Sequence, residues 1–286
     1  MLAEIQQFIN WLRRRNPTAR TWRDYRYDLT QFAALLDDPP PQDVSFRDVD
    51  RFVTAQAARG FSPATINRRL AAIMALYTFL ADEDPSLICP VLPHRHALKQ
   101  PQRLPRPVKA DELDQFFALI HDARDRAMFL LMLRCGLRIS EVAGLQLGDL
   151  YLAESHPRLV AHGKGSKERA VYLSAQAERA LRAYLRERPR AASPFVFLSY
   201  QHHGLSTTAI HKRLMHYRAQ AGLTLTAHRL RHTFANDLVG AEMPVTSIQK
   251  LLGHAWLETT QIYVAANDHQ VQADYYTAVG KLEGWQ

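Results

Sequence analysis

Four short stretches of this sequence carry side chains whose types suit chemistry on a phosphate ester. Two guanidinium groups can hold both non-bridging oxygens of a phosphodiester and offset the charge of a pentacoordinate phosphorus. A phenol has an unperturbed pKa of about 10, so it needs cations or a proton acceptor nearby to attack, and lysine or histidine can protonate the departing sugar oxygen. The side chains are Arg138, Lys164, His228, Arg231, His254 and Tyr263. They could attack a phosphodiester without a metal ion or other cofactor, and no carboxylate cluster suited to Mg²⁺ accompanies them.

The first two stretches place cations where a phosphate could be bound. In GLRISEV, Ser140 is expected to cap a short helix and leave Arg138 beside its positive end. The alternative is a surface ion pair between Arg138 and Glu141. In the turn GKGSK, flanking glycines leave Lys164 projecting, and Lys167 follows it. A phosphate contact by these lysines competes with a plain exposed basic turn.

The third stretch, TAHRLRHTF, combines histidine and arginine at helical spacing. If Thr226 caps a helix, His228 and Arg231 lie three residues apart on one face. His228 and His232 lie four apart, which also fits a zinc pair. The zinc-protease pattern has glutamate directly after the first histidine, but Arg229 stands there, so we favour phosphate binding over metal binding.

The fourth stretch, LLGHAWLETTQIYVAAN, contains the candidate nucleophile. Gly253 is expected to end a helix, so His254 stands at a corner nine positions before Tyr263. The alternative is that Tyr263 only packs its ring, as most tyrosines do. Tyr275 and Tyr276 are rival hydroxyls, but no Gly-His pair precedes them, and we favour Tyr263.

The elements that must position these residues fall into two parts. A proline-rich, cationic stretch without apolar periodicity, LPHRHALKQPQRLPRPVK, is typical of a linker. We therefore expect a helical domain over residues 1–92, a linker over 93–108 and a second domain over 109–286.

In the first domain the clearest helix begins at Ser62 as N-cap, with Pro63 in its first turn. Apolar residues then recur at helical spacing up to residue 80. Asn67, Arg68 and Arg69 fall largely off that apolar stripe, so they are candidates for contact with DNA, and the alternative is an ordinary solvated face.

The second domain is predicted to be mostly helical with one small antiparallel sheet. ADELDQFFALI and DRAMFLLMLRCG have helical patterns, and Gly136 stops the second. RLVAHGKGSKERAVYLS alternates like a hairpin, and helical patterns resume near residues 175, 207 and 226. The fold class is therefore mainly α, of the α+β kind.

Composition indicates a basic protein with a polyanionic partner. The 286 residues carry a formal net charge of +8, and the excess is evenly spread: residues 1–108 hold 15 Lys and Arg against 11 Asp and Glu, and the rest hold 21 against 17. Nucleic acid is the first candidate partner. Two cysteines set no disulfide framework, no apolar run reaches membrane-spanning length, and the first residues lack the order of a secretory signal. We expect a cytoplasmic protein without a membrane partner.

These stretches resemble the tyrosine recombinase family, which includes phage integrases, Cre and the Xer recombinases. GLRISEVAGLQLGDL, GKGSKERAVYL, HRLRHTFAN, LLGH and TTQIYVAA occur in the family's order between residue 111 and about residue 267. SPATINRRLAAIMALYTFL is similar to a helix of the family's core-binding, SAM-like domain. The length is most like that of the Xer branch. The resemblance implies a C-shaped clamp around DNA, made of a core-binding domain and a catalytic domain.

The resemblance also implies a role for each phosphate-binding residue. Arg138 and Arg231 would clamp the scissile phosphate, His254 would donate a hydrogen bond to it, and Glu141 would support the site. Lysines and arginines outside this set, including Lys167, would contact DNA.

Strand exchange follows from the remaining residues of the family's set. Tyr263 would attack phosphorus and form a 3′-phosphotyrosine bond, Lys164 would protonate the departing 5′ oxygen, and His228 would assist proton transfer. The implied enzyme is a site-specific recombinase that acts as a homotetramer on two duplexes, with or without a partner recombinase. Dimer or cointegrate resolution and integration of a mobile element all fit this activity.

The sequence departs from the family pattern at two places. Trp256 stands where many relatives carry small residues, and DLVGAEMPVTS lacks the usual glycine-centred link between two helices. Neither departure removes a catalytic residue type. The tail, with apolar residues at 271, 275, 279 and 282, is expected to dock on a neighbouring protomer.

Three other functions compete with recombination. A relaxing topoisomerase would use the same phosphotyrosine chemistry, and a DNA-binding regulator would keep the fold without catalysis. A zinc hydrolase would use His228 and His232 with His202 or His203. The full residue set favours the recombinase.

Overall fold

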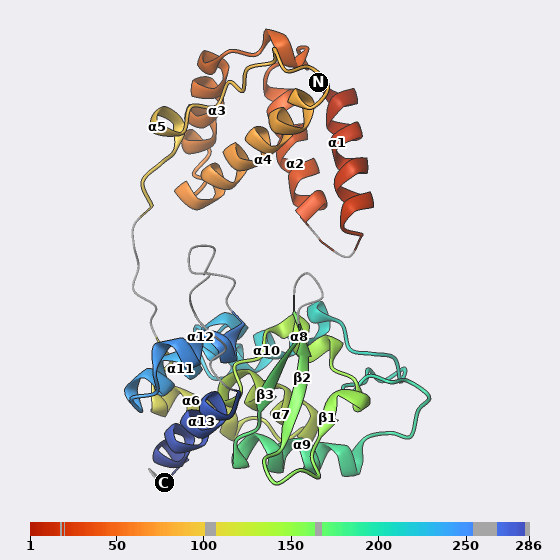
Figure 1. Cartoon of the computed structure of the whole chain (residues 1–286), viewed down its shortest axis with the longest axis vertical. Coiled ribbons are helices and arrows are strands. Elements are labelled where there is room, and N and C mark those ends of the chain that lie inside the picture. The colour runs from red at the N-terminus through yellow and green to blue at the C-terminus, as the bar shows by residue number, and fades with distance from the viewer. Residues whose placement is uncertain (18, 20, 101–106, 164–167, 254–267, 284–286) are drawn as a thin grey trace. The chain divides into compact units, whose positions relative to one another are not determined.

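A computed structural model describes residues 1–286 apart from 18, 20, 101–106, 164–167, 254–267 and 284–286. The chain forms two compact units, Met1–Arg103 and Leu104–Gln286, each with its own hydrophobic core (Figure 1). None of the helices in these described segments is long and apolar enough to cross a membrane.

The first unit is helical throughout its described residues. Helices α1 and α2 pack against each other, and α4 packs against α1, α2 and α3 (Figure 1). Large aromatic side chains such as Phe8, Phe32 and Phe52 are fully buried between them. The helices are α1 (Leu2–Arg15), α2 (Thr21–Leu35), α3 (Phe46–Ala58), α4 (Pro63–Ala81) and the short α5 (Pro93–His96), with a 3₁₀ turn at Pro41–Asp43.

Helix α4 confirms the prediction made from its capping residue and apolar spacing. The Ser62 side chain accepts a hydrogen bond from the Thr65 N–H at 3.3 Å, which satisfies one of the free donors of the first turn. The predicted apolar positions are buried, and the Tyr77 hydroxyl donates to the Pro41 carbonyl at 2.8 Å.

The start of the predicted linker belongs to the first unit. Asn67 on α4 donates to the Leu98 carbonyl at 2.8 Å and accepts from the Leu98 N–H at 2.9 Å. Arg95 makes a two-nitrogen contact with Asp50 on α3, and the His96 side chain is buried beside it. Because these polar contacts fix residues 93–98 to α3 and α4, this segment is not the extended linker that its composition predicts.

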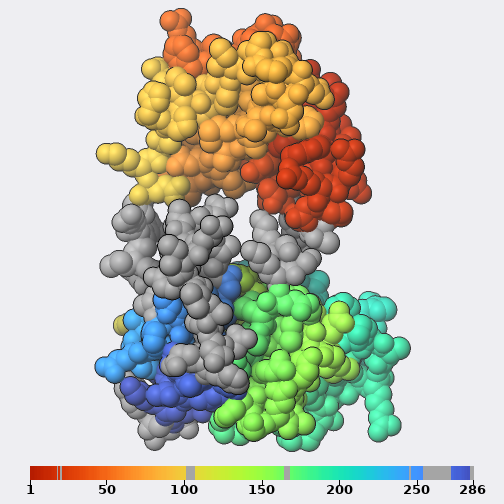
Figure 2. Space-filling view, in the orientation of Figure 1, coloured from red at the N-terminus to blue at the C-terminus, as the bar shows by residue number. Residues whose placement is uncertain are grey.

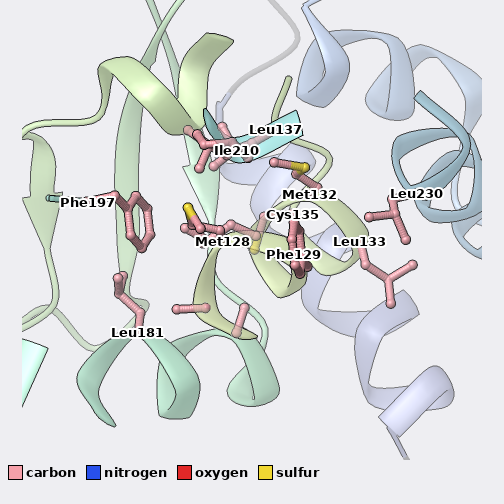
Figure 3. Close-up of a cluster of buried hydrophobic side chains, with 14 of the residues drawn as sticks. Met128, Phe129, Met132, Leu133, Cys135, Leu137, Leu181, Phe197, Ile210 and Leu230 are labelled. Atoms are coloured by element: carbon pink, nitrogen blue, oxygen red, sulfur yellow. The ribbon is translucent and has the colours of Figure 1, made fainter. Parts of the chain in front are cut away.

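The second unit is built around α7 (Ala123–Arg134), a helix buried on almost every side. Figure 3 shows Met128, Phe129 and Met132 of α7 among side chains from several surrounding elements. The other helices are α6 (Ala110–Ala118), α8 (Ile139–Gly144), α9 (Ala175–Glu187), α10 (Thr207–Gln220), α11 (Ala227–Gly240), α12 (Val245–Leu252) and α13 (Asp268–Glu283), with a 3₁₀ turn at Leu147–Asp149.

The predicted hairpin forms two strands of a three-stranded antiparallel sheet in the order β1-β2-β3. The strands are β1 (Leu150–Tyr151), β2 (Arg158–His162) and β3 (Glu168–Tyr172). Leu159 pairs with Val171, and Ala161 pairs with Arg169. Since residues opposite each other share a face, Arg169 lies on the core-facing side with three buried apolar residues.

Three predicted helix ends are confirmed and one is wrong. Thr226 caps α11 by accepting from the Arg229 N–H at 3.1 Å. Gly136 after α7 and Gly253 after α12 both have positive φ, at 66° and 58°, which glycine adopts without steric cost. Ser140 does not cap α8, because the N-cap residue is Arg138.

Helix α13 packs on its own chain. The Tyr275 side chain is 1 % exposed, and its hydroxyl donates to the Arg134 carbonyl at 3.2 Å. Tyr276 donates to the Pro157 carbonyl at 3.3 Å, and the dark blue atoms of α13 adjoin the green atoms of the sheet region in Figure 2. The tail expected to dock on a neighbour therefore completes the core of this unit in the single chain.

Candidate active site

A buried carboxylate, Glu141, forms the centre of the site. Its side chain is 1 % exposed. Arg138 donates to it from the backbone N–H at 2.7 Å and from Nη1 at 2.8 Å. Arg169 donates from Nη1 to Oε1 at 2.6 Å and from Nη2 to Oε2 at 2.9 Å. The carboxylate therefore orients two guanidinium groups that come from α8 and β3, two elements separate in the chain.

Arg231 reaches the same carboxylate from α11. Its Nη1 lies 3.8 Å from Glu141 Oε2, and it donates to the carbonyl of Gly136. Gly136 must be glycine here, because a Cβ would lie 2.5 Å from the Phe234 ring in addition to the positive φ. The loop between α7 and α8 thus approaches α11 closely enough for Arg231 to join the cluster.

The three arginines also hold the last carbonyl oxygens of α12. These carbonyls have no partner within their own helix, so side-chain donors can satisfy them. The pairs are Arg169 Nε with Leu251 at 2.7 Å, Arg231 Nη2 with Leu252, and Arg138 Nη2 with Gly253 at 3.2 Å. Residue 254 follows directly, so the arginine cluster fixes the point from which the LLGH stretch continues.

The electrostatics of the cluster favour an anion. Three guanidinium groups and one carboxylate leave a net of two positive charges. Burial, followed by the charge of Arg138, lowers the pKa of Arg231 to about 9, although Glu141 acts in the opposite direction. Burial acts to raise the pKa of Glu141, but Arg169 and then Arg138 outweigh it, so this pKa lies below its ordinary value. A bound phosphate would relieve the crowding of positive charge.

His228 lies on α11 one turn before Arg231, and it is exposed. Its Nε2 shares a hydrogen bond with the Nε2 of His232 at 2.7 Å. Burial lowers the pKa of His228, and the charges of His232 and Arg231 lower it further. The neutral imidazole is therefore favoured, which suits a group that accepts a proton.

The structure brings Arg138, Glu141 and Arg231 together, as the resemblance implies. His228 is on the same helix as Arg231. Four of the predicted site residues lie outside the described residues: Lys164, Lys167, His254 and Tyr263.

The candidate DNA-contacting residues of α4 have partners inside the first unit. Arg69 is 3 % exposed, donates to Gln56 and stacks over Phe61. Arg68 pairs with the buried Asp28, but 44 % of its side chain remains exposed. Contact between these residues and DNA stays a prediction, with Arg68 the most accessible of the three.

Arg169 is the residue of the cluster that sequence reasoning missed. Its signal was present in the alternation of ERAVYL, where positions 169 and 171 share the face of the strand that packs on the core. An arginine in phase with a buried valine requires a buried partner.

The rival readings find less support among the described residues. No group of three or more potential metal ligands occurs there, so His228 and His232 have no third ligand in His202 or His203. Burial raises the pKa of the Tyr275 hydroxyl well above its ordinary value and that of Tyr276 to about 12. Both rival hydroxyls therefore serve the packing of α13.

Fold and site together define a DNA-processing enzyme with a phosphate-binding arginine cluster. Residues 106–270 match the phage integrase family, and residues 5–84 match the N-terminal SAM-like domain of phage integrases.

Curated relatives match almost the whole chain. Tyrosine recombinase XerC of Listeria welshimeri is 33 % identical over 94 % of this chain and 95 % of its own length. Tyrosine recombinase XerD of Lacticaseibacillus casei is 36 % identical over 95 % of this chain and 97 % of its own length. The chain belongs to the phage integrase family, as a site-specific tyrosine recombinase of the Xer branch.

Solved structures of low sequence identity share the fold. A lambda integrase dimer bound to a COC′ core site matches with a TM-score of 0.71 at 18 % identity, covering 92 % of this chain and 98 % of that one. XerH recombinase bound to its difH substrate matches with a TM-score of 0.66 at 23 % identity, covering 88 % and 77 %. These matches agree with a mostly helical chain that carries one small antiparallel sheet.

Proposed function

We propose that this recombinase cuts and rejoins DNA at a site where Arg138 and Arg231 clamp the scissile phosphate and Tyr263 attacks it. The observation that supports the proposal is the meeting of these two arginines, distant in sequence, on one buried carboxylate. A net of two positive charges matches the dianionic pentacoordinate phosphorus better than the monoanionic diester. The site would therefore stabilise the transition state more than the ground state.

Each bond and proton has an assigned partner in the proposed reaction. The Tyr263 oxygen attacks phosphorus and gives up its proton, which neutral His228 helps to accept. The bond to the 5′ oxygen breaks, and Lys164 protonates that oxygen as it leaves. His254 donates a hydrogen bond to a non-bridging oxygen. The resulting 3′-phosphotyrosine retains the energy of the broken diester, so a 5′ hydroxyl of another strand can reverse the step without ATP.

Position in the chain supports Tyr263 as nucleophile. It lies between α12, whose last carbonyls are held by the arginine cluster, and α13, which is packed on the core. Both neighbouring elements are thus tied to the unit that carries the clamp. Such anchoring limits the positions open to the intervening segment.

The DNA partner is proposed to be a double-stranded recombination site, with four protomers on two duplexes. A lambda integrase tetramer bound to a Holliday junction shares the fold, with a TM-score of 0.69 at 18 % identity. Dimer resolution, cointegrate resolution and integration share this chemistry. The target sequence decides among them, as does any requirement for a second recombinase.

A suicide substrate tests the proposal. A nick near the cleavage site releases a short 5′ fragment, so the covalent intermediate accumulates because religation lacks its nucleophile. Wild-type protein should yield a protein–DNA adduct, and Tyr263→Phe should yield none while DNA binding persists, because one hydroxyl is removed and the phosphate contacts remain.

Tyr276→Phe is the matched control, since it removes a hydroxyl that donates to the Pro157 carbonyl. This variant should still form the adduct. An adduct with Tyr263→Phe, or its loss with Tyr276→Phe alone, would contradict the assignment. Sequencing the trapped DNA identifies the recombination site.

A further inference from the structure

Arg169 occupies a place in the site to which the proposed mechanism gives no role. It lies on the core-facing side of β3, and its side chain is only 12 % exposed. We propose that Arg169 is a positioning residue for strand cleavage, which sets the Arg138 guanidinium through Glu141 and sets the start of the LLGH stretch through the end of α12. This proposal rests on the proposed function of Arg138 as a phosphate clamp.

Glu141 transmits the first effect. Oε1 accepts from Arg138 Nη1 at 2.8 Å and from Arg169 Nη1 at 2.6 Å, so two cations share that oxygen. Arg231 is farther away, at 3.8 Å. Without Arg169, the buried carboxylate would have Arg138 as its main counter-charge and would hold it more tightly. The guanidinium would then be less available to a phosphate, and the net charge of the cluster would fall from two to one.

The end of α12 transmits the second effect. Arg169 Nε donates to the Leu251 carbonyl at 2.7 Å. A Cβ at Gly253 would lie 3.0 Å from the Arg169 Cδ, so the stem of the arginine packs against the glycine that ends the helix. One side chain therefore touches both the carboxylate behind the clamp and the turn that leads to residue 254.

Lysine cannot replace this geometry. A guanidinium presents donors in a rigid fork, and Arg169 uses Nε, Nη1 and Nη2 at the same time. An ammonium group keeps the charge but cannot reach both carboxylate oxygens and the helix end together. Arg169→Lys therefore separates the geometry of the fork from its charge.

The experiment compares Arg169→Lys and Arg169→Gln with wild-type protein in three measurements: adduct formation at saturating suicide substrate, the dissociation constant for DNA, and thermal unfolding. We expect both variants to slow adduct formation by about 10- to 100-fold, because the clamp is misplaced. DNA affinity should change by less than about threefold, because the buried side chain makes no DNA contact.

Arg158→Lys and Arg158→Gln are the matched controls. Arg158 lies on the neighbouring strand β2 and also binds a carboxylate through two nitrogens, Glu154 at 2.9 and 3.0 Å. These variants should cleave like wild type.

Two further measurements separate positioning from support of the fold. A methylphosphonate at the scissile position removes one phosphate charge, so the Arg169→Gln defect should shrink on this substrate. The double variant Glu141→Gln with Arg169→Gln should cleave faster than Arg169→Gln alone, because loss of the buried carboxylate releases Arg138.

The proposal is overturned if Arg169→Lys cleaves at the wild-type rate, if the double variant gains nothing, or if cleavage and DNA binding fall together with thermal stability. The wild-type adduct keeps the two proposals distinguishable. Its absence contradicts the proposed function, whereas its presence with an undiminished Arg169→Lys contradicts only the role of Arg169.

Discussion

The hydrogen-bonded imidazoles of His228 and His232 define how the site should respond to pH. Burial first, and then the charges of His232 and Arg231, lower the pKa of His228 below its ordinary value of 6.5. A proton acceptor must be neutral, and a lowered pKa keeps His228 neutral further into the acidic range. Cleavage should therefore persist below pH 6.5 and fall only as His228 becomes protonated.

Replacement of His232 tests this at single-residue resolution. His232→Leu removes one of the causes that lower the pKa of His228, so that pKa should rise and the acidic limb of the cleavage profile should move up by a few tenths to about one pH unit. The measurement is the single-turnover rate of adduct formation between pH 5 and 8. His211→Leu, an exposed change on α10, is the control, and coincident profiles for wild type and His232→Leu would refute the coupling.

At the scale of elements, α13 is part of the core of the second unit. Tyr275 is buried with Ala278 and Val279 of the same helix, and its hydroxyl donates to Arg134. Tyr275→Ala should lower the free energy of unfolding by about 3–5 kcal/mol, as expected for a buried aromatic side chain. Tyr275→Phe should cost only about 1 kcal/mol, for one hydrogen bond.

Denaturant unfolding of the two variants measures the difference. Equal and small losses would show that α13 is not held through Tyr275. The same packing affects the expected role of the tail in assembly: deletion of residues 268–286 would uncover this core in addition to weakening cooperative DNA binding. Cooperativity is therefore better compared between wild type and Tyr275→Phe.

The ends of α1 and α2 carry a cationic cluster that the sequence did not single out. The guanidinium carbons of Arg13, Arg23 and Arg26 lie 5.7, 5.0 and 5.8 Å from the centre of the Trp22 ring. Among the described residues none of these three exposed arginines pairs with a carboxylate. Such a concentration of unpaired charge suits a DNA backbone.

Salt dependence tests that surface. Each phosphate contact contributes a slope of about −0.9 to log K against log salt, so changing all three arginines to glutamine should reduce the slope by about 2–3. A matched triple change on α9, at Arg179, Arg182 and Arg186, alters the net charge equally and should leave the slope near that of wild type. Equal effects of both triples would mean that only total charge matters.

Most elements could be predicted from the sequence because their signals are local. Ser62 and Thr226 cap helices through donors three residues ahead, and the alternation of the hairpin fixes its pairing. Ser140 failed as a cap because Glu141 accepts from the Arg138 N–H and makes Arg138 the N-cap instead. That carboxylate is drawn inward by Arg169, a tertiary contact that no local pattern reveals.

The site was predictable to the extent that its residues form recognisable stretches. Arg138 and Arg231 were identified by resemblance, and the structure adds what joins them: one carboxylate and one helix end. The roles of Asn67 and Arg69 were not predictable, because the carbonyl of Leu98 and the side chain of Gln56 approach them only in the folded unit.

At the scale of the whole molecule, each unit has its own buried core and should fold alone. The first core is closed by α1 to α4, and the second surrounds α7. Fragments 1–103 and 104–286 should therefore each unfold cooperatively, as followed by circular dichroism during denaturation. A fragment that lacks a cooperative transition would show that its core depends on the other unit.

The same division separates chemistry from affinity. Every described residue of the arginine cluster, together with His228, belongs to the second unit. Fragment 104–286 should therefore form the covalent adduct when DNA is saturating, but with a dissociation constant weaker by at least about 100-fold, because it has lost the gain from a linked second binding module. Adding fragment 1–103 in trans should not restore that affinity, since the effective concentration supplied by the linker is absent. Full affinity of fragment 104–286 alone would mean that the first unit contributes no DNA contacts, and failure to cleave at saturation would mean that the first unit helps to assemble the site itself.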